Sequence, residues 1–134
     1  MKKVTKSLSS VLLKVYGYMN NYDFQLLNKM LKTNDYISNL LISYPKKEYV
    51  LKDNMERCMY ELVELIHYIN INTGRVKEKY FKDFVVKLSM LDYYTLISYK
   101  KKYIDKRRRD VIGRFLVEIK KISYGVMKNE SNSF

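Results

Sequence analysis

Apolar side chains recur every three or four positions in three segments of this 134-residue chain, and less regularly, with one spacing of six, in a fourth. In an α-helix that spacing places the side chains on one face, which has to be buried against other elements. The longest run follows spacings of 4, 3, 4, 3 and 4: Leu51, Met55, Cys58, Leu62, Leu65 and Ile69. The other runs are Leu27, Leu31, Ile37 and Leu41, then Phe81, Phe84, Leu88 and Leu91, then Ile112, Phe115, Ile119, Ile122 and Val126. The pattern predicts four amphipathic helices.

The breaks between these runs have local causes. Pro45 cannot donate a helical hydrogen bond and disfavours helical geometry at the residue before it, so the first helix is expected to end there. Gly74 suits the left-handed position that follows a helix, and Asp105 suits the N-cap of the fourth helix. Asp53 with Glu56 forms a plausible capping pair for the second helix, which could also begin several residues earlier.

The connections are short, which makes successive helices antiparallel. Only four glycines and one proline are present, which disfavours a β-protein with many tight turns, and the length suits one domain. We therefore predict an all-α protein, an up-down antiparallel four-helix bundle over residues 23–128. Residues 1–22 are predicted to be a short basic amphipathic N-terminal extension without acidic residues, and residues 129–134 a polar tail.

A second apolar stripe lies beside the main one on two of the predicted helices. In the third helix it comprises Val86, Met90, Tyr93 and Ile97, and in the second Met59, Val63 and Ile66. A broad apolar face either widens the core of one bundle or packs against another subunit. The second alternative predicts a homo-oligomer.

Residues able to catalyse a reaction or to bind a metal are scarce. His67 is the only histidine and Cys58 the only cysteine, and neither belongs to a recognisable triad or ligand spacing. The glutamates of the second helix do not form the Glu-x-x-His pairs of a di-iron bundle, and no glycine-rich phosphate loop is present. We predict a protein that is not an enzyme, with no metal site and no cofactor.

The same features bear on the cellular setting. A single cysteine excludes a disulfide within the chain and fits a reducing compartment. Lys14 interrupts the apolar run near the N-terminus, and no stretch approaches the length of a membrane span. The sequence therefore predicts a cytoplasmic protein that does not bind a membrane.

Positive charge is concentrated near the C-terminus. The formal net charge is +12, and residues 100–134 hold eleven cations against four acids. Four of the six arginines fall within eight positions of this segment. Such an excess favours polyanionic partners, above all nucleic acid.

The basic stretch KKKYIDKRRRD also has an electrostatic cost. If Asp105 caps the fourth helix, Lys106 and the three arginines after it occupy the first turn, where each cation costs roughly 0.3–1 kcal/mol. Arg107, Arg114, Lys121 and Lys128 are spaced by seven, so they form a column with steps of about 10.5 Å on the side away from the apolar seam. The alternatives are a solvated face and a surface that binds phosphate groups without reading base edges. The candidate nucleic-acid-binding residues are Lys100, Lys101, Lys102, Lys106, Arg107, Arg108, Arg109, Arg114, Lys120, Lys121 and Lys128.

Fourteen tyrosines raise the question of base stacking. Most lie at helix flanks, where a tyrosine ring packs and its hydroxyl reaches water. Tyr99, directly before the basic stretch, and Tyr103, within it, are the two exceptions that we consider for stacking.

The order of these segments resembles that of the Avd accessory proteins of diversity-generating retroelements, and more distantly the bundle proteins encoded in intervening sequences of ribosomal RNA genes. The resemblance covers about residues 30–128 and is carried by Tyr44-Pro45-Lys46, Leu88 with Leu91, Tyr103-Ile104-Asp105, and Glu118-Ile119 with Gly125. It implies a four-helix bundle that assembles as a basic pentameric barrel. It also implies binding to nucleic acid and to the retroelement's reverse transcriptase, which the protein would support in mutagenic cDNA synthesis without catalysis of its own.

Two other functions remain open at this point. One is a bundle that binds ribosomal or other RNA without a polymerase partner. The other is a purely structural bundle whose positive charge reflects composition alone.

Overall fold

A computed structural model of the protein describes residues 19–132, and this range contains four long α-helices and no strand. The helices are α2 (Asn21–Leu41), α3 (Tyr49–Ile71), α4 (Gly74–Lys100) and α5 (Lys106–Asn132), with a 3-10 turn, η1 (Lys46–Glu48), before α3. The predicted all-α four-helix bundle is confirmed. Most of the predicted N-terminal extension lies outside the described residues.

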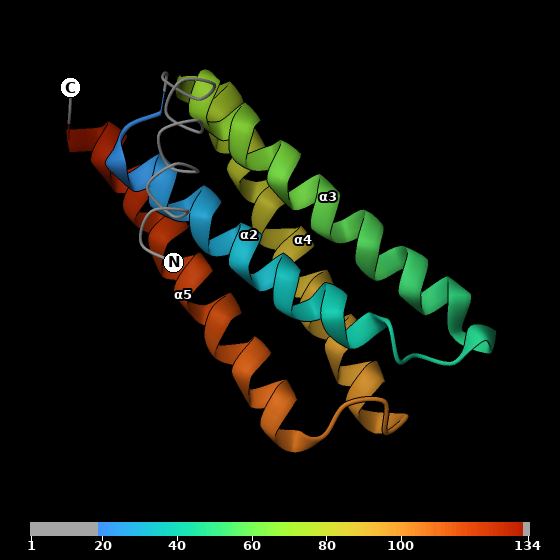
Figure 1. Cartoon of the computed structure of the whole chain (residues 1–134). Coiled ribbons are helices and arrows are strands. Elements are labelled where there is room, and N and C mark those ends of the chain that lie inside the picture. Colours follow the sequence, from blue (N-terminus) through green and yellow to red (C-terminus); the bar gives the residue numbers. More distant parts are fainter. Residues whose placement is uncertain (1–18, 133–134) are drawn as a thin grey trace, which may run out of the picture.

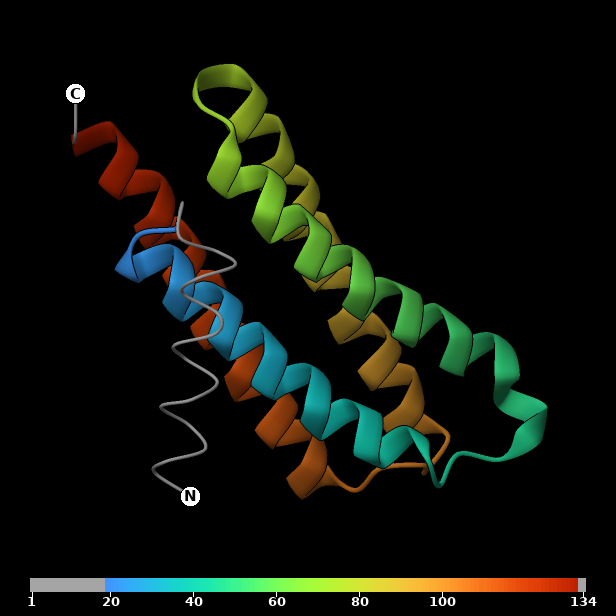
Figure 2. The same cartoon turned by 45° about the horizontal axis from the view of Figure 1, so that its top comes forward.

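The helices run alternately up and down, so that α2 lies beside α5 and α3 beside α4 (Figures 1 and 2). α2 also contacts α3, and α4 contacts α5, which closes a ring of four neighbours. The α2–α3 and α4–α5 connections therefore lie at one end of the bundle. The short α3–α4 turn lies at the other end, near the beginning of α2 (Figure 1).

The predicted apolar runs form the core. Phe84 is fully buried at its centre, and all four helices contribute further buried side chains: Leu26, Leu27, Met30, Ile37, Leu41, Met55, Leu62, Ile66, Ile69, Leu91, Ile112 and Ile119. Met59 and Ile66 of the second stripe are also buried in this core. On α3, therefore, the broad apolar face widens the core of a single bundle.

The helix ends follow local rules at some positions and not at others. The Arg108 N–H donates to Asp105 Oδ1 at 2.9 Å, so the predicted N-cap of α5 is confirmed. Gly74 has the left-handed φ of +61°, but it is the first residue of α4, and the extended residues Asn72 and Thr73 separate it from the end of α3, so it does not cap α3 as predicted. Asp53 does not cap α3, because that helix already begins at Tyr49. α5 continues to Asn132, beyond the predicted end at residue 128.

The end of α4 is closed without a glycine. Lys102 adopts φ 67°, and the Tyr103 N–H donates to the Ser98 carbonyl at 2.9 Å. This is the Schellman arrangement, in which glycine is the usual left-handed residue. A lysine therefore occupies a position where its backbone is disfavoured.

Candidate nucleic-acid interface

The outer face of α5 carries the predicted column of cations. Arg107, Arg114, Lys121 and Lys128 are all exposed, whereas Ile112, Ile119 and Val126 of the same helix are buried on the opposite side. Lys106 and Lys120 are exposed beside the column. Helical periodicity alone is enough to produce this separation, because the apolar and the cationic positions repeat on opposite faces.

The three consecutive arginines are not equivalent. Arg108 stays near its own helix end, where Nη1 donates to Asp105 Oδ2 at 2.9 Å. Arg109 turns toward α4, donates from Nη1 to Thr95 Oγ1 at 3.0 Å, and lies 3.8 Å from Asp92 Oδ1. Arg107 makes no ion pair with any described residue and is exposed. Of the three, Arg107 is therefore the arginine most available to an external phosphate.

A shallow hollow of about 990 Å³ lies over this part of α5. Gly113 and Val117 lie in it, and four cations border it: Lys106, Arg107, Arg109 and Arg114. Three carboxylates also border it: Asp92, Asp110 and Glu118. The hollow therefore lies beside the first two members of the column and extends toward Asp92 of α4.

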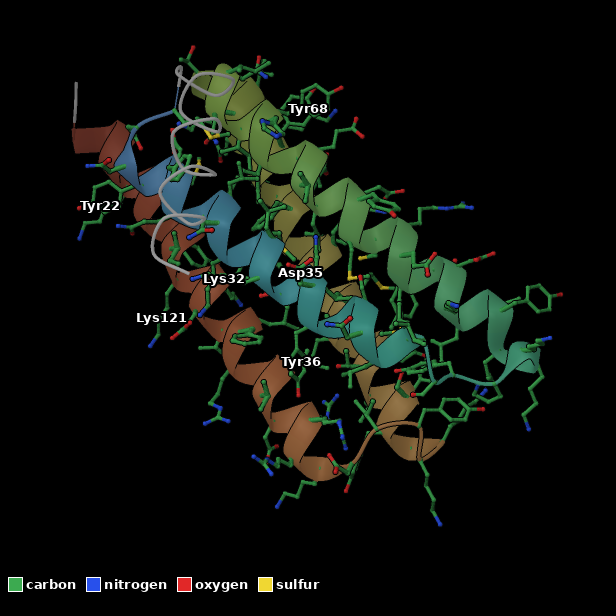
Figure 3. The ribbon with its side chains drawn as sticks, in the orientation of Figure 1. Tyr22, Lys32, Asp35, Tyr36, Tyr68 and Lys121 are labelled. Carbon is green, nitrogen blue, oxygen red and sulfur yellow. The ribbon has the colours of Figure 1, made fainter. Side chains whose placement is uncertain are left out.

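A second groove, of about 420 Å³, separates α5 from α2. Lys29 pairs across it with Glu118, and its Nζ lies 4.8 Å from the centre of the Phe115 ring. The hydrogen bond and charge of Lys29 lower the pKa of Glu118. Lys32 and Lys121 line the same groove from opposite helices, and Figure 3 shows both of them.

Sequence reasoning did not include Lys29 and Lys32 among the candidate residues. Residues 23–45 carry equal numbers of cations and acids, so their local charge gives no signal. Lys32 joins the basic surface only because α2 packs beside α5. The sequence did offer one clue: Lys32 lies beside the first apolar run at helical spacing, which places it at the edge of the buried face of that helix.

The two connections at one end of the bundle are joined through Glu48. The Tyr103 hydroxyl donates to Glu48 Oε1 at 2.8 Å, and Lys101 Nζ lies 3.0 Å from the same oxygen. The Tyr103 hydrogen bond, followed by that of Lys101, lowers the pKa of Glu48. The rings of Tyr44 and Tyr103 are 5.2 Å apart, so both loops also share an aromatic contact.

This junction decides the role of several predicted residues. Lys101 is paired with Glu48, and Tyr103 is partly buried against Tyr44, so its ring is part of the loop contact. Tyr99 is exposed, as are Lys100 and Lys102. Lys46 and Lys47 of η1 are exposed at the same end of the bundle, although they lie more than fifty residues earlier in the chain.

An apolar stripe remains on the outside of α4. Val86, Met90 and Tyr93 are 60%, 37% and 51% exposed, and their spacing of four and three places them on one face. Ile97, the fourth member of the predicted stripe, is partly buried against the core. On α4, unlike α3, the second stripe is therefore a solvent-exposed surface of the single chain.

The remaining chemically notable side chains are buried or half-buried. The Cys58 thiol donates to the Lys87 carbonyl at 3.3 Å, and burial raises its pKa to about 11. His67 is half-buried, and burial lowers its pKa. The described part of the chain contains no group of three or more His, Cys, Asp or Glu side chains placed to hold a metal ion. No helix within residues 19–132 has the length and apolar character that a membrane span requires.

Comparison with known proteins gives no relative. No protein family, curated protein or solved structure matches the chain.

Proposed function

We propose that this protein is a non-catalytic nucleic-acid-binding accessory protein that contacts the phosphate backbone through the outer face of α5. The observation that carries the proposal is the column of Arg107, Arg114, Lys121 and Lys128. All four are exposed, and none forms an ion pair with a described residue. Lys121 acts on Glu118 only through its charge, which lowers the pKa of that carboxyl. Cations that are not held in ion pairs are available to release counterions from a polyanion.

The arrangement favours the backbone over the bases as the binding target. The cations lie on an exposed helix face, and of the two tyrosines considered for stacking, Tyr103 is held in the loop junction and only Tyr99 is exposed. Contacts of this kind provide affinity and position without reading sequence. We therefore expect similar affinity for strands of different sequence and a strong dependence on salt.

The resemblance to Avd proteins supplies the biological part of the proposal. On that basis the protein associates with the reverse transcriptase of a retroelement and supports mutagenic cDNA synthesis. Assembly into a homo-oligomer, a pentamer by the same resemblance, is supported by the exposed stripe of Val86, Met90 and Tyr93 on α4. A contiguous apolar surface on a small soluble domain is typical of a protein interface.

The test of nucleic-acid binding compares two double variants that remove the same charge. Arg114→Ala with Lys121→Ala removes two cations of the column, and Arg57→Ala with Arg75→Ala removes two exposed arginines elsewhere. Each pair lowers the formal net charge of +12 by two. Binding of a fluorescein-labelled strand of mixed sequence, as DNA and as RNA, is measured by anisotropy over a series of salt concentrations.

The column variant should bind more weakly and reduce the magnitude of the log-affinity against log-salt slope by about 1.4–1.8, since each lost contact contributes about 0.7–0.9. The control pair should retain the parent slope. Equal losses of affinity for the two double variants would mean that net charge alone drives binding. That result is expected if the bundle is purely structural and its positive charge reflects composition alone.

Co-purification tests the partner. Tagged protein should recover a reverse transcriptase encoded by a neighbouring gene, and nuclease treatment should weaken the interaction without abolishing it. Recovery of ribosomal RNA and ribosomal proteins alone would favour the alternative of an RNA-binding bundle without a polymerase partner.

A further inference from the structure

The hollow on α5 has an excess of positive charge once the existing ion pairs are accounted for. Arg109 and Asp92 approach each other at 3.8 Å, and Glu118 pairs with Lys29 on α2. The other four charged groups of the hollow are Lys106, Arg107, Asp110 and Arg114, which form no ion pair with any described residue. Three cations therefore face one carboxylate in this hollow.

Gly113 lies within this group of charges. A Cβ atom at this position would meet no other atom within 4 Å, so neighbouring side chains do not require a glycine. Glycine in the interior of a helix is nevertheless less favourable than alanine. The same holds for Gly125 of α5, so a glycine alone is not evidence of a site. What distinguishes Gly113 is that it lies in a hollow bordered by cations.

The dimensions of the hollow suit a segment of a polymer. About 990 Å³ lies at the upper end of the range for ligand clefts, so a single ion would not fill it. Arg107 and Arg114 are seven residues apart, about 10.5 Å along the helix. That distance corresponds to about three nucleotides of a stacked strand, which carries one phosphate per roughly 3.4 Å.

We propose that the hollow over Gly113 seats a short stretch of nucleic-acid backbone. Two phosphates of this stretch bind Arg107 and Arg114, and the sugars next to them pack over Gly113 and Val117, which line the same hollow. This inference rests on the proposed function and adds a defined contact to it. A membrane surface fits less well, because interfacial helices present a continuous apolar face, whereas this hollow is bordered mainly by charged residues.

The experiment adds one methyl group without changing charge. Gly113→Ala adds the methyl group within the hollow, and Gly125→Ala adds the same group to the same helix outside it. Both variants should raise Tm by about 3–5 °C, because alanine is the better helix former. Affinity for the labelled strand, measured by anisotropy, should fall for Gly113→Ala and stay at the parent value for Gly125→Ala, because only the first methyl group lies where the sugars pack. The salt slope should stay at the parent value, because no cation is removed.

Several results would overturn the inference. If Gly113→Ala binds as well as the parent while Lys121→Ala with Lys128→Ala, two column residues outside the hollow, binds weakly, the column contacts nucleic acid and the hollow does not. Equal losses of affinity for Gly113→Ala and Gly125→Ala would point to a general effect on the helix. Binding to phosphatidylserine vesicles in preference to the strand would assign the hollow to a membrane. Absence of any salt-dependent binding by the parent would remove the proposed function as well.

Discussion

Replacing Arg109 with alanine is expected to destabilise the bundle, although the same change at Arg107, two positions earlier, is not. The Arg109 side chain is only 25% exposed and donates to Thr95 Oγ1 at 3.0 Å. The Thr95 hydroxyl in turn donates to the Asp92 carbonyl at 2.8 Å, and Thr95 is 1% exposed. Arg109 therefore connects α5 to a buried polar group of α4.

The magnitude follows from the contacts that are lost and the repulsion that is relieved. A hydrogen bond from a charged donor contributes about 1.5–3 kcal/mol to stability. The approach to Asp92 at 3.8 Å adds little, because the Asp92 side chain is 53% exposed. Removing a cation from a helix N-terminus returns roughly 0.3–1 kcal/mol. The net cost of Arg109→Ala is about 1–2 kcal/mol, whereas Arg107→Ala should be neutral or slightly stabilising.

Urea unfolding followed by circular dichroism measures both variants, and Thr95→Val completes a double-mutant cycle with Arg109→Ala. We expect a coupling energy of about 1 kcal/mol, in the range found for residues in direct contact. Nucleic-acid binding should show the opposite order, with Arg107→Ala reducing the salt slope by about 0.7–0.9 and Arg109→Ala leaving it unchanged. Equal stability of the two variants, or a coupling energy near zero, would refute a structural role for Arg109.

Two further predictions concern the loop junction and the α4 stripe. Because the pKa of Glu48 is lowered by Tyr103 and Lys101, its charged form stabilises the fold above the ordinary value of 4.5, and this contribution is lost as the pH falls through the lower folded value. Glu48→Gln should therefore unfold with a shallower pH dependence below about pH 4.5 in acid titrations. Identical curves for Glu48→Gln and the parent would contradict the role of the junction. Val86→Glu with Tyr93→Lys should lower the oligomer mass in light scattering without loss of helicity, whereas Ile42→Glu, outside the stripe and 78% exposed, should not; a parent that is already monomeric at micromolar concentration would remove the interface.

Local periodicity was sufficient to predict the helices and the cationic face of α5. Residues seven positions apart in one helix share a face whatever surrounds it, so the column from Arg107 to Lys128 follows from spacing alone. The Asp105 cap is equally local, because its bond to the Arg108 N–H spans three residues. The end of α4 was harder to predict from the sequence, because Lys102 occupies the left-handed position where glycine is usual.

The second apolar stripes show where local patterns become ambiguous. Met59 on α3 and Val86 on α4 look alike in the sequence, yet Met59 is buried and Val86 is 60% exposed. Periodicity defines a face but not how far the helix is rotated about its axis. That rotation depends on how the two neighbouring helices fill the core, which is a property of the packed bundle.

The division of the basic residues into bound and available ones was decided by tertiary structure. Arg109 meets Thr95 and Lys101 meets Glu48 across fourteen and fifty-three residues of sequence, and Lys32 approaches Lys121 only through the pairing of α2 with α5. Charge counted along the chain cannot distinguish such residues, because a partner on another helix is set by packing order and not by sequence distance. The sequence determined where positive charge lies on α5, and the fold determined which of those charges an external phosphate can reach.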